Sequence, residues 1–401
     1  MAVLMDKARA RRIMERHELD ALIGTARENI AYVSGLEGVD RRGSNRLERM
    51  FVVFPRDPDK ETVLIIPRSY LMQVLQTRFN DCAIRTAGSY YYVMADGNAL
   101  SEEERELVAL RERLYEYAST GEALVSVLAD LELGERPTIG IDESHMYFGE
   151  WKQLSEAFPR ARLREAYRVF REIRMVKTPV EVERLRRAAE VNEQAMLDAI
   201  ELIREGVEHR VILDKLRQGI VCTGATISHD AIGFAWRSNY SHVEPSDYRA
   251  RLGDAFKFDH GSFFNGYASD TARSGVIGKA SPQLVSRYAA VRDAQQLGIE
   301  KVRPGMTASE LFNIMIESLR KGLKNDSFQR HNLGHGIGRD VYDAPNIDPK
   351  DDTVLEAGMV LNIEAPDYEL GFGGLTLEDT VLLKDDGVEY FTHADRDLII
   401  R

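Results

Sequence analysis

The sequence predicts an α/β domain followed by an α+β domain, and three observations support this division. The chain has 401 residues, which is too long for one ordinary hydrophobic core. Its first 165 residues alternate short apolar runs with amphipathic stretches, a pattern typical of α/β layering. Later in the chain, apolar strands are separated by turn residues, which favours a mostly antiparallel sheet with intervening helices.

The first domain is expected to contain buried strands with helices between them. Apolar runs predict strands at 20–24, 50–54, 62–67 and 138–142. Amphipathic stretches predict helices within 68–77 and 102–131. The segment TARE at 25–28 has the Ser/Thr-x-x-Glu form of a capping box, so a short helix is expected to open there.

A well-capped helix is expected where the second domain begins. Thr178 is a good N-cap, Pro179 suits the first helical position, and Glu181 can complete a capping box. An apolar stripe at helical spacing follows, and Gly206 is a plausible stop. We therefore expect domains at 1–168 and 169–401.

The second domain is expected to be α+β. Strands are predicted at 254–258, 267–276, 359–363 and 375–383. Helices are predicted at about 281–300 and about 308–323, the latter capped by TASE at 307–310.

Charge and cysteine content argue against several classes of protein. There are 53 basic and 65 acidic side chains, giving a net charge of −12, which disfavours nucleic acid or an anionic membrane as the main partner. Two isolated cysteines, Cys82 and Cys222, fit a reducing compartment. The charged start lacks the apolar segment of a signal peptide, and no apolar run is long enough to span a membrane. We expect a cytoplasmic protein.

Five residues of the second domain suggest a metal site. Asp259 and Asp270 lie eleven residues apart around a glycine-containing turn, and a hairpin with that spacing can bring their carboxylates together. His335 follows in a glycine-rich run, while Glu364 and Glu378 lie in apolar strands, where an unpaired carboxylate is costly.

Four carboxylates and one imidazole suit two divalent first-row ions such as Mn²⁺, Co²⁺, Fe²⁺ or Zn²⁺. A structural zinc site would more often use Cys and His. Each acid taken alone could be an ordinary solvated or salt-bridged side chain, so the joint pattern carries the inference.

The contexts of these five residues are FDHG, GYASDTARS, GHGIG, GMVLNIEAP and LEDTVLL. In this order they closely resemble the pita-bread metallohydrolase superfamily, which includes creatinase, aminopeptidase P, prolidase and methionine aminopeptidase. The segments 21–36 and 171–191 resemble the creatinase-type N-terminal domain and the interdomain junction, so the resemblance covers nearly the whole chain. It implies a pita-bread catalytic domain, a dinuclear metal site and a homodimer.

The resemblance also implies roles for the five residues. Asp259 would bind one metal bidentately, Asp270 and Glu378 would bridge both metals, and His335 and Glu364 would complete the second. A hydroxide bridging the metals would attack the scissile amide carbonyl, with Glu364 as proton shuttle. Mn²⁺ or Co²⁺ is favoured, with Zn²⁺ and Fe²⁺ as alternatives.

Substrate contacts are also implied. His242 lies in SHVEPSDYRARLGD, which resembles the PHYRP…GD segment of prolidases, and there this histidine faces the substrate. His331 matches a second substrate-binding histidine. Either could instead be an ordinary hydrogen-bonded loop residue. Arg46 in a charged loop could grip a substrate carboxylate, and Trp236 could shape the pocket; a solvated loop and core packing are the alternatives.

Three positions depart from the peptidase pattern. Tyr342 stands where the peptidases carry a histidine that stabilises the tetrahedral intermediate; a neutral tyrosine can still donate a hydrogen bond. Thr376 replaces an arginine common in aminopeptidase P and prolidase, and Ala272 replaces Thr or Ser.

Three functions follow from this pattern. The first is an Xaa-Pro dipeptidase or aminopeptidase, which the resemblance favours. The second is a non-peptidase relative acting on a small metabolite, like ectoine hydrolase, creatinase or dimethylsulfoniopropionate lyase. The third is a non-catalytic binding protein, which the survival of all five metal ligands disfavours.

Overall fold

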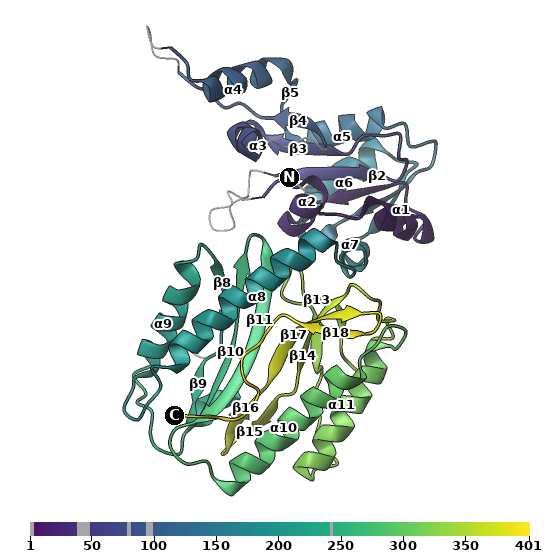
Figure 1. Ribbon diagram of the computed structural model, residues 1–401. Helices are drawn as coiled ribbons and strands as arrows, with labels where there is room; N and C mark the ends of the chain where they lie inside the picture. Colours follow the sequence, from purple (N-terminus) through teal and green to yellow (C-terminus); the bar gives the residue numbers. More distant parts are fainter. Residues whose placement is uncertain (1–3, 38–48, 78–81, 94–98, 241–243) are drawn as a thin grey trace. The chain divides into compact units, whose positions relative to one another are not determined.

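A computed structural model describes residues 4–37, 49–77, 82–93, 99–240 and 244–401 of the chain (Figure 1). The chain divides into two compact units, Met1–Ile173 and Arg174–Arg401. The sequence-based boundary at 168/169 lies five residues before this division, in the helix that ends the first unit. Among the described helices, none is long and apolar enough to cross a membrane.

The first unit is built on a seven-stranded mixed sheet with the order β5-β4-β3-β2-β1-β6-β7. The pairs β1–β2 and β2–β3 are antiparallel, and the remaining pairs are parallel. All four predicted strands are confirmed within one residue, since apolar runs fill the central strands. The strand bounds are β1 Ala21–Gly24, β2 Phe51–Pro55, β3 Val63–Pro67, β4 Ala83–Ala87, β5 Glu116–Tyr117, β6 Thr138–Ile141 and β7 Arg162–Glu165.

Helices connect these strands. The predicted helical region 102–131 is divided, because Leu114 adopts an extended conformation and the next residues form the edge strand β5. The helix bounds are α1 Lys7–Arg16, α2 Arg27–Ser34, η1 Arg68–Tyr70, α3 Leu71–Thr77, α4 Glu102–Arg113, α5 Thr120–Asp130, η2 Glu143–His145, α6 Phe148–Ala157 and α7 Tyr167–Arg174.

The capping box predicted at TARE is wrong. Helix α2 begins at Arg27, with Ala26 as its N-cap and no side-chain cap. The Thr25 hydroxyl instead donates to the Asp142 carbonyl oxygen. The Asp142 carboxylate accepts from the Ala26 backbone N–H and the Asn29 side chain, so a residue distant in sequence satisfies this helix start.

The second unit is built on a ten-stranded, mostly antiparallel sheet. Its main path is β13-β12-β14-β17-β11-β10-β8, with β18, β19 and β9 attached at the side, and β15 and β16 form a separate pair. Only the β11–β19 pairing is parallel among the described strand pairs of this sheet. The bounds are β8 Thr226–Asp230, β9 Gly233–Phe234, β10 Ala255–Phe264, β11 Tyr267–Val276, β12 Gly334–Gly336, β13 Asp343–Asn346, β14 Val360–Glu364, β15 Asp367–Glu369, β16 Gly373–Leu375, β17 Glu378–Lys384, β18 Gly387–Tyr390 and β19 Ile399–Ile400.

The predicted strands of this unit are confirmed, with two changes. The run 375–383 is divided between β16 and β17 because the two pieces pair with different neighbours, β15 and β14. The strand predicted at 254–258 extends to Phe264, which gives β10 and β11 equal length in a hairpin.

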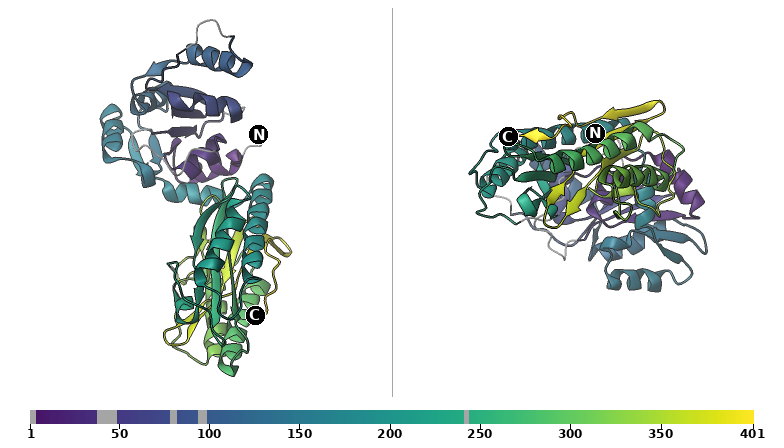
Figure 2. Two further views of the ribbon diagram at one scale, coloured as in Figure 1. Left: turned by 90° about the vertical axis from the view of Figure 1, so that its left-hand side faces the viewer. Right: turned by 90° about the horizontal axis from the view of Figure 1, so that it is seen from below.

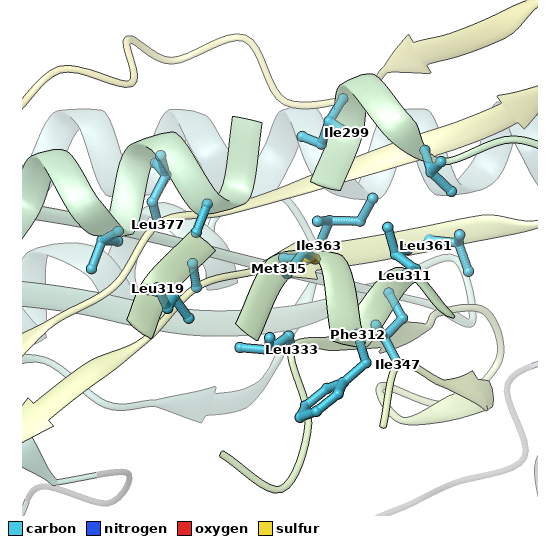
Figure 3. Close-up of a cluster of buried hydrophobic side chains, with 14 of the residues drawn as sticks. Ile299, Leu311, Phe312, Met315, Leu319, Leu333, Ile347, Leu361, Ile363 and Leu377 are labelled. Atoms are coloured by element: carbon cyan, nitrogen blue, oxygen red, sulfur yellow. The ribbon is translucent and has the colours of Figure 1, made fainter. Parts of the chain in front are cut away.

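Four helices and one short helix accompany this sheet. They are α8 Pro179–Ile200, α9 His209–Val221, η3 Ala235–Asn239, α10 Pro282–Lys301 and α11 Ala308–Leu323. Helix α8 runs beside the strands and contacts β10 and β11 (Figures 1 and 2). Side chains of α10 and α11 pack on β14 and its neighbours in one buried apolar cluster, in which Met315, Leu361 and Ile363 meet (Figure 3).

The start of α8 confirms the predicted capping box. Thr178 accepts from the Glu181 backbone N–H, the Glu181 side chain accepts from the Thr178 N–H, and Pro179 is the first helical residue. The predicted stop at Gly206 is wrong, since α8 ends at Ile200. Gly206 has a φ of +80° and serves the turn that leads into α9.

Candidate metal centre

The β10–β11 hairpin places two aspartates on one face of the sheet. Asp259 pairs with Ala272, and Gly261 pairs with Asp270. Because paired residues and alternate residues of a strand share a face, both carboxylates point to the same side. They share a neighbour, His229 on β8, whose Nε2 lies 3.6 Å from Asp259 Oδ1 and 3.1 Å from Asp270 Oδ1.

Three further strands bring the remaining candidates to this face. Ala272 pairs with Glu378 on β17, and Glu378 pairs with Glu364 on β14, which makes one row across four strands. In the adjoining row, His335 on β12 pairs with Asn362. Thus residues separated by more than a hundred positions share one patch of sheet.

Glycine beside His335 permits the close approach of β12 to β14. Gly334 has a φ of +136°, and a Cβ there would lie 2.2 Å from the Asn362 carbonyl oxygen. Any larger residue would push the strands apart and move His335. This gives a physical reason for at least one glycine of the run that surrounds this histidine.

Two groups of donor atoms are formed on this face. His229, Asp259 and Asp270 make the first, and Asp270, His335 and Glu378 make the second; within each, the donor atoms lie within 4.8 Å of one another. Asp270 belongs to both groups, with Oδ1 near His229 and Oδ2 at 3.7 Å from His335 Nε2. A carboxylate with one oxygen in each group has the geometry of a bridging ligand.

His335 tests whether these residues fit a cation. Its Nδ1 lies 3.0 Å from the Gly336 carbonyl oxygen, to which it can donate, and this leaves the Nε2 lone pair available. His335 Nε2 is buried and has no hydrogen-bond partner among the described residues. It lies 3.8 Å from Glu378 Oε1, too far for a hydrogen bond but suitable for a shared ion. The residues present therefore fit a divalent cation.

The raised pKa values of the two glutamates also indicate a cation site. Burial, together with Asp270 and Glu364, raises the pKa of Glu378 well above its ordinary value. Burial and Asp259 raise the pKa of Glu364 to about 8. Glu364 faces Glu378 across the β14–β17 pair but belongs to neither compact donor group among the described residues. Such clustered acids lower their energy by binding protons or cations.

Sequence reasoning missed two residues of this site, His229 and Lys257. Lys257 Nζ is fully buried and lies 3.2 Å from Asp259 Oδ2. Although burial raises the pKa of Asp259, Lys257 and His229 lower it more. The two-residue spacing from Asp259 on a strand could have identified Lys257, because positions i and i+2 share a face.

The predicted substrate residues have different outcomes. The Tyr342 ring lies 4.2 Å from the His335 ring, and burial and Asp270 raise the tyrosine pKa, so it stays a hydrogen-bond donor. His331 is exposed just before β12. Trp236, on η3, packs edge-on against Tyr240, and η3 contacts β10. His242 and Arg46 lie outside the described residues.

Thr376 and Ala272, which depart from the peptidase pattern, are both small, buried residues. Thr376 is buried, exchanges backbone hydrogen bonds with the Ser274 hydroxyl, and brings no charge to the sheet. Ala272 is buried between Asp259 and Glu378 in the row of paired residues. A small side chain there leaves space between the two carboxylates.

Comparison with known proteins agrees with this geometry. The sequence model of metallopeptidase family M24 matches residues 183–385, and that of the creatinase/prolidase N-terminal domain matches residues 7–176. The chain belongs to metallopeptidase family M24. Membership of M24 confirms the predicted pita-bread fold and a metallopeptidase-like hydrolase, and it implies divalent metal ions.

Curated relatives share much of the M24 region. The Xaa-Pro dipeptidase of Pyrococcus furiosus is 35% identical over 233 residues, which cover 58% of this chain and 67% of the relative. The Xaa-Pro dipeptidase of Lactobacillus helveticus is 32% identical over 271 residues, which cover 66% of this chain and 72% of the relative.

Solved structures share the fold over nearly the whole chain. An Xaa-Pro dipeptidase from Bacillus anthracis superposes with a TM-score of 0.79 at 21% identity, covering 98% of this chain and 99% of that one. A prolidase from Pyrococcus furiosus gives 0.73 at 24% identity, covering 96% and 99%. At these identities the likeness establishes the fold.

Proposed function

We propose that this protein is a dinuclear-metal Xaa-Pro dipeptidase that acts on small peptides. The observation that carries the proposal is Asp270, which presents one oxygen to each of two donor groups. The names of the curated relatives support the choice of substrate, since those matched at 35% and 32% identity are Xaa-Pro dipeptidases.

The proposed metal ligands are the five residues predicted from the sequence, Asp259, Asp270, His335, Glu364 and Glu378. Oxygen-rich ligands with one imidazole favour Mn²⁺ or Co²⁺, with Zn²⁺ and Fe²⁺ as alternatives. When bound, two such cations lower the pKa of a shared water and polarise the substrate carbonyl.

The chain's own residues would supply proton transfer and hydrogen bonding. Glu364 would act as the proton shuttle, because a carboxylate beside the reacting water suits general base catalysis. Tyr342 stays protonated and would donate a hydrogen bond to the oxyanion that develops on the substrate. His331 and His242 would contact the peptide, and Arg46 and Trp236 remain candidates for its outer groups.

Location and assembly complete this proposal. We infer a cytoplasmic homodimer: the chain has only two cysteines, Cys82 and Cys222, far apart in the sequence, as a reducing compartment favours, and the family resemblance supports the dimer. The net charge of −12 supports a partner that is neither nucleic acid nor an anionic membrane.

A second candidate is a non-peptidase hydrolase of a small metabolite. It is favoured by Tyr342 and Thr376, which replace the histidine and the arginine of the peptidase pattern. Lys257 adds a buried cation that the pattern did not include.

Proline release decides between these candidates. The protein, reconstituted with Mn²⁺ or Co²⁺, would be offered Xaa-Pro dipeptides and Xaa-Pro-Yaa tripeptides. We expect chelator-sensitive turnover that is faster on dipeptides. Faster turnover of tripeptides would indicate an aminopeptidase, and no turnover by fully metallated protein would reject the peptidase assignment in favour of the metabolite hydrolase.

A further inference from the structure

His229 reaches the aspartates across a glycine. On β8 it pairs with Gly261 of β10, and Gly261 pairs with Asp270 of β11, so the three lie in one row on the same face. A Cβ at Gly261 would lie 2.6 Å from His229 Cε1 and 2.6 Å from Ser228 Oγ. The missing side chain is therefore what lets the imidazole lie over the strand and approach Asp270.

The ring of His229 is oriented in the way metal-binding histidines usually are. Nδ1 lies 3.0 Å from Ser228 Oγ, and Nε2 faces the two aspartates. When a histidine binds a metal through one nitrogen, the other commonly donates to an oxygen that fixes the ring. Ser228 supplies such an oxygen here.

Asp259 presents only one carboxylate oxygen to the donor group that it forms with His229 and Asp270. Its Oδ2 lies 3.2 Å from Lys257 Nζ and 3.4 Å from the Tyr368 hydroxyl. Lys257 is fully buried and also contacts the Tyr240 carbonyl oxygen at 3.1 Å. A bidentate Asp259 would have to take Oδ2 from a buried ammonium, which is costly. Oδ1 is the oxygen that faces His229.

We propose that His229 is a metal ligand through Nε2, together with Asp259 Oδ1 and Asp270 Oδ1, while Lys257 holds Asp259 Oδ2. The imidazole takes the place of the second Asp259 oxygen in this half of the centre. The assignment rests on the proposed function only in requiring that the centre binds divalent ions. The orphaned Nε2 of His335 in the adjoining donor group independently indicates such ions.

A mixed ligand set has a consequence for metal choice. With a second imidazole, the centre should favour Co²⁺ or Zn²⁺ over Mn²⁺ more strongly than the five predicted ligands alone would, since imidazole suits the later first-row metals. Removing the imidazole should reduce that preference.

The test is Co²⁺ binding to the full chain after removal of metal, followed by calorimetry. Wild-type protein should bind two ions. His229→Ala should weaken one of them by at least about 10-fold, as loss of a metal ligand or its partner does, and leave the other within a factor of two. His393→Ala, which changes an exposed histidine of the same unit, should leave both unchanged.

Proton NMR of the Co²⁺ protein identifies the ligand directly. Imidazole N–H signals of metal-bound histidines shift strongly in the paramagnetic protein, so wild type should show signals from His229 and His335, and His229→Ala should lose one. His229→Asn provides a second variant if the alanine protein does not fold.

The outcomes separate this assignment from the proposed function. Unchanged Co²⁺ binding and an unchanged number of shifted signals in folded His229 variants would overturn the ligand assignment, whatever the turnover. A wild-type protein that binds two ions through both histidines but releases no proline would overturn the peptidase and leave the ligand assignment standing.

Discussion

Glu378 and Asp379 are consecutive residues of β17 with opposite surroundings. Glu378 faces other acids, and burial, Asp270 and Glu364 raise its pKa. Asp379 points to the other face, where Arg273 lies at 2.7 Å and Arg396 at 2.7 Å. Burial raises the Asp379 pKa, but these two arginines lower it more.

One strand therefore serves two purposes, one on each face of the sheet. On the helix-covered face, the chain supplies its own cations, so the buried carboxylate is a structural ion pair. On the other face, Lys257 pairs with Asp259, but Asp270, Glu364 and Glu378 gather with an orphaned imidazole nitrogen and require a cation from outside. The alternation of side chains along a strand separates stability from metal binding.

The largest effect is expected on the face of β17 that carries Glu378 and the other clustered carboxylates. Glu378→Gln should lower turnover of an Xaa-Pro dipeptide by more than about 100-fold, because losing even the outer partners of metal ligands costs 10–100-fold. Secondary structure should be retained in circular dichroism. Asp386→Asn, in an exposed turn of the same unit, is the matched control and should keep full activity.

The next largest effect is expected on the face of β17 where Asp379 pairs with arginines. Asp379→Asn should destabilise the second unit by about 3 kcal/mol, because the buried Arg273 loses the carboxylate at 2.7 Å and keeps only Glu193 at 4.0 Å. Urea unfolding in a Trp151→Phe background would measure this, since the remaining Trp236 lies in the second unit. A change below about 1 kcal/mol would show that the ion pair contributes little.

Removing metal should also destabilise the second unit. Each divalent ion at 100 times its dissociation constant stabilises the folded state by about 2.7 kcal/mol, so chelation should lower the unfolding free energy by about this amount for every ion removed. Glu378→Gln should respond much less to chelator. An equal response in both proteins would place the stabilising ion elsewhere.

The two faces should also respond to pH with opposite signs. The lowered pKa of Asp379 contributes stability that is present above the ordinary carboxyl value of 3.8 and lost as pH falls through the folded pKa. The raised pKa of Glu378 contributes stability to metal-free protein that is present below 4.5 and lost as pH rises. In chelator, the urea midpoint of Glu378→Gln should rise above that of wild type, and the difference should grow with pH. The midpoint of wild type should exceed that of Asp379→Asn, and this difference should shrink as the pH falls.

The smallest effect is expected from a hydrogen bond to the Asp379 carboxylate. The buried Thr392 hydroxyl donates to Asp379 Oδ1 at 2.7 Å. Thr392→Val removes this donor, and with it the acceptor of the Thr380 backbone N–H, while both arginines remain, so a loss of about 1.5 kcal/mol is expected from the same urea measurement. A loss as large as that of Asp379→Asn would mean that the hydroxyl, rather than the arginines, holds the carboxylate.

Much of the fold and the metal site could be predicted from the sequence. Apolar runs gave the central strands because burial on both faces demands them, and Thr178, Pro179 and Glu181 specified the start of α8 locally. Asp259 and Asp270 could be placed together because a hairpin fixes their register.

The remaining features depend on contacts distant in sequence. The role of His229 requires the three-strand row through Gly261, including an irregular register in the β8–β10 pairing, which no local pattern encodes. Thr25 fails as a cap because it binds the Asp142 carbonyl, 117 residues away. Tertiary contacts thus overrode the local capping signal at Thr25, and in the second unit they brought His229 to the aspartates.

The most direct test of this account is a metal titration followed by activity. Chelated protein would be titrated with Mn²⁺ while hydrolysis of an Xaa-Pro dipeptide is measured. The account predicts no turnover without metal and a rise that saturates at about two ions per chain, as a bridged two-metal site requires. Full turnover in excess chelator, or none at saturating metal, would contradict it.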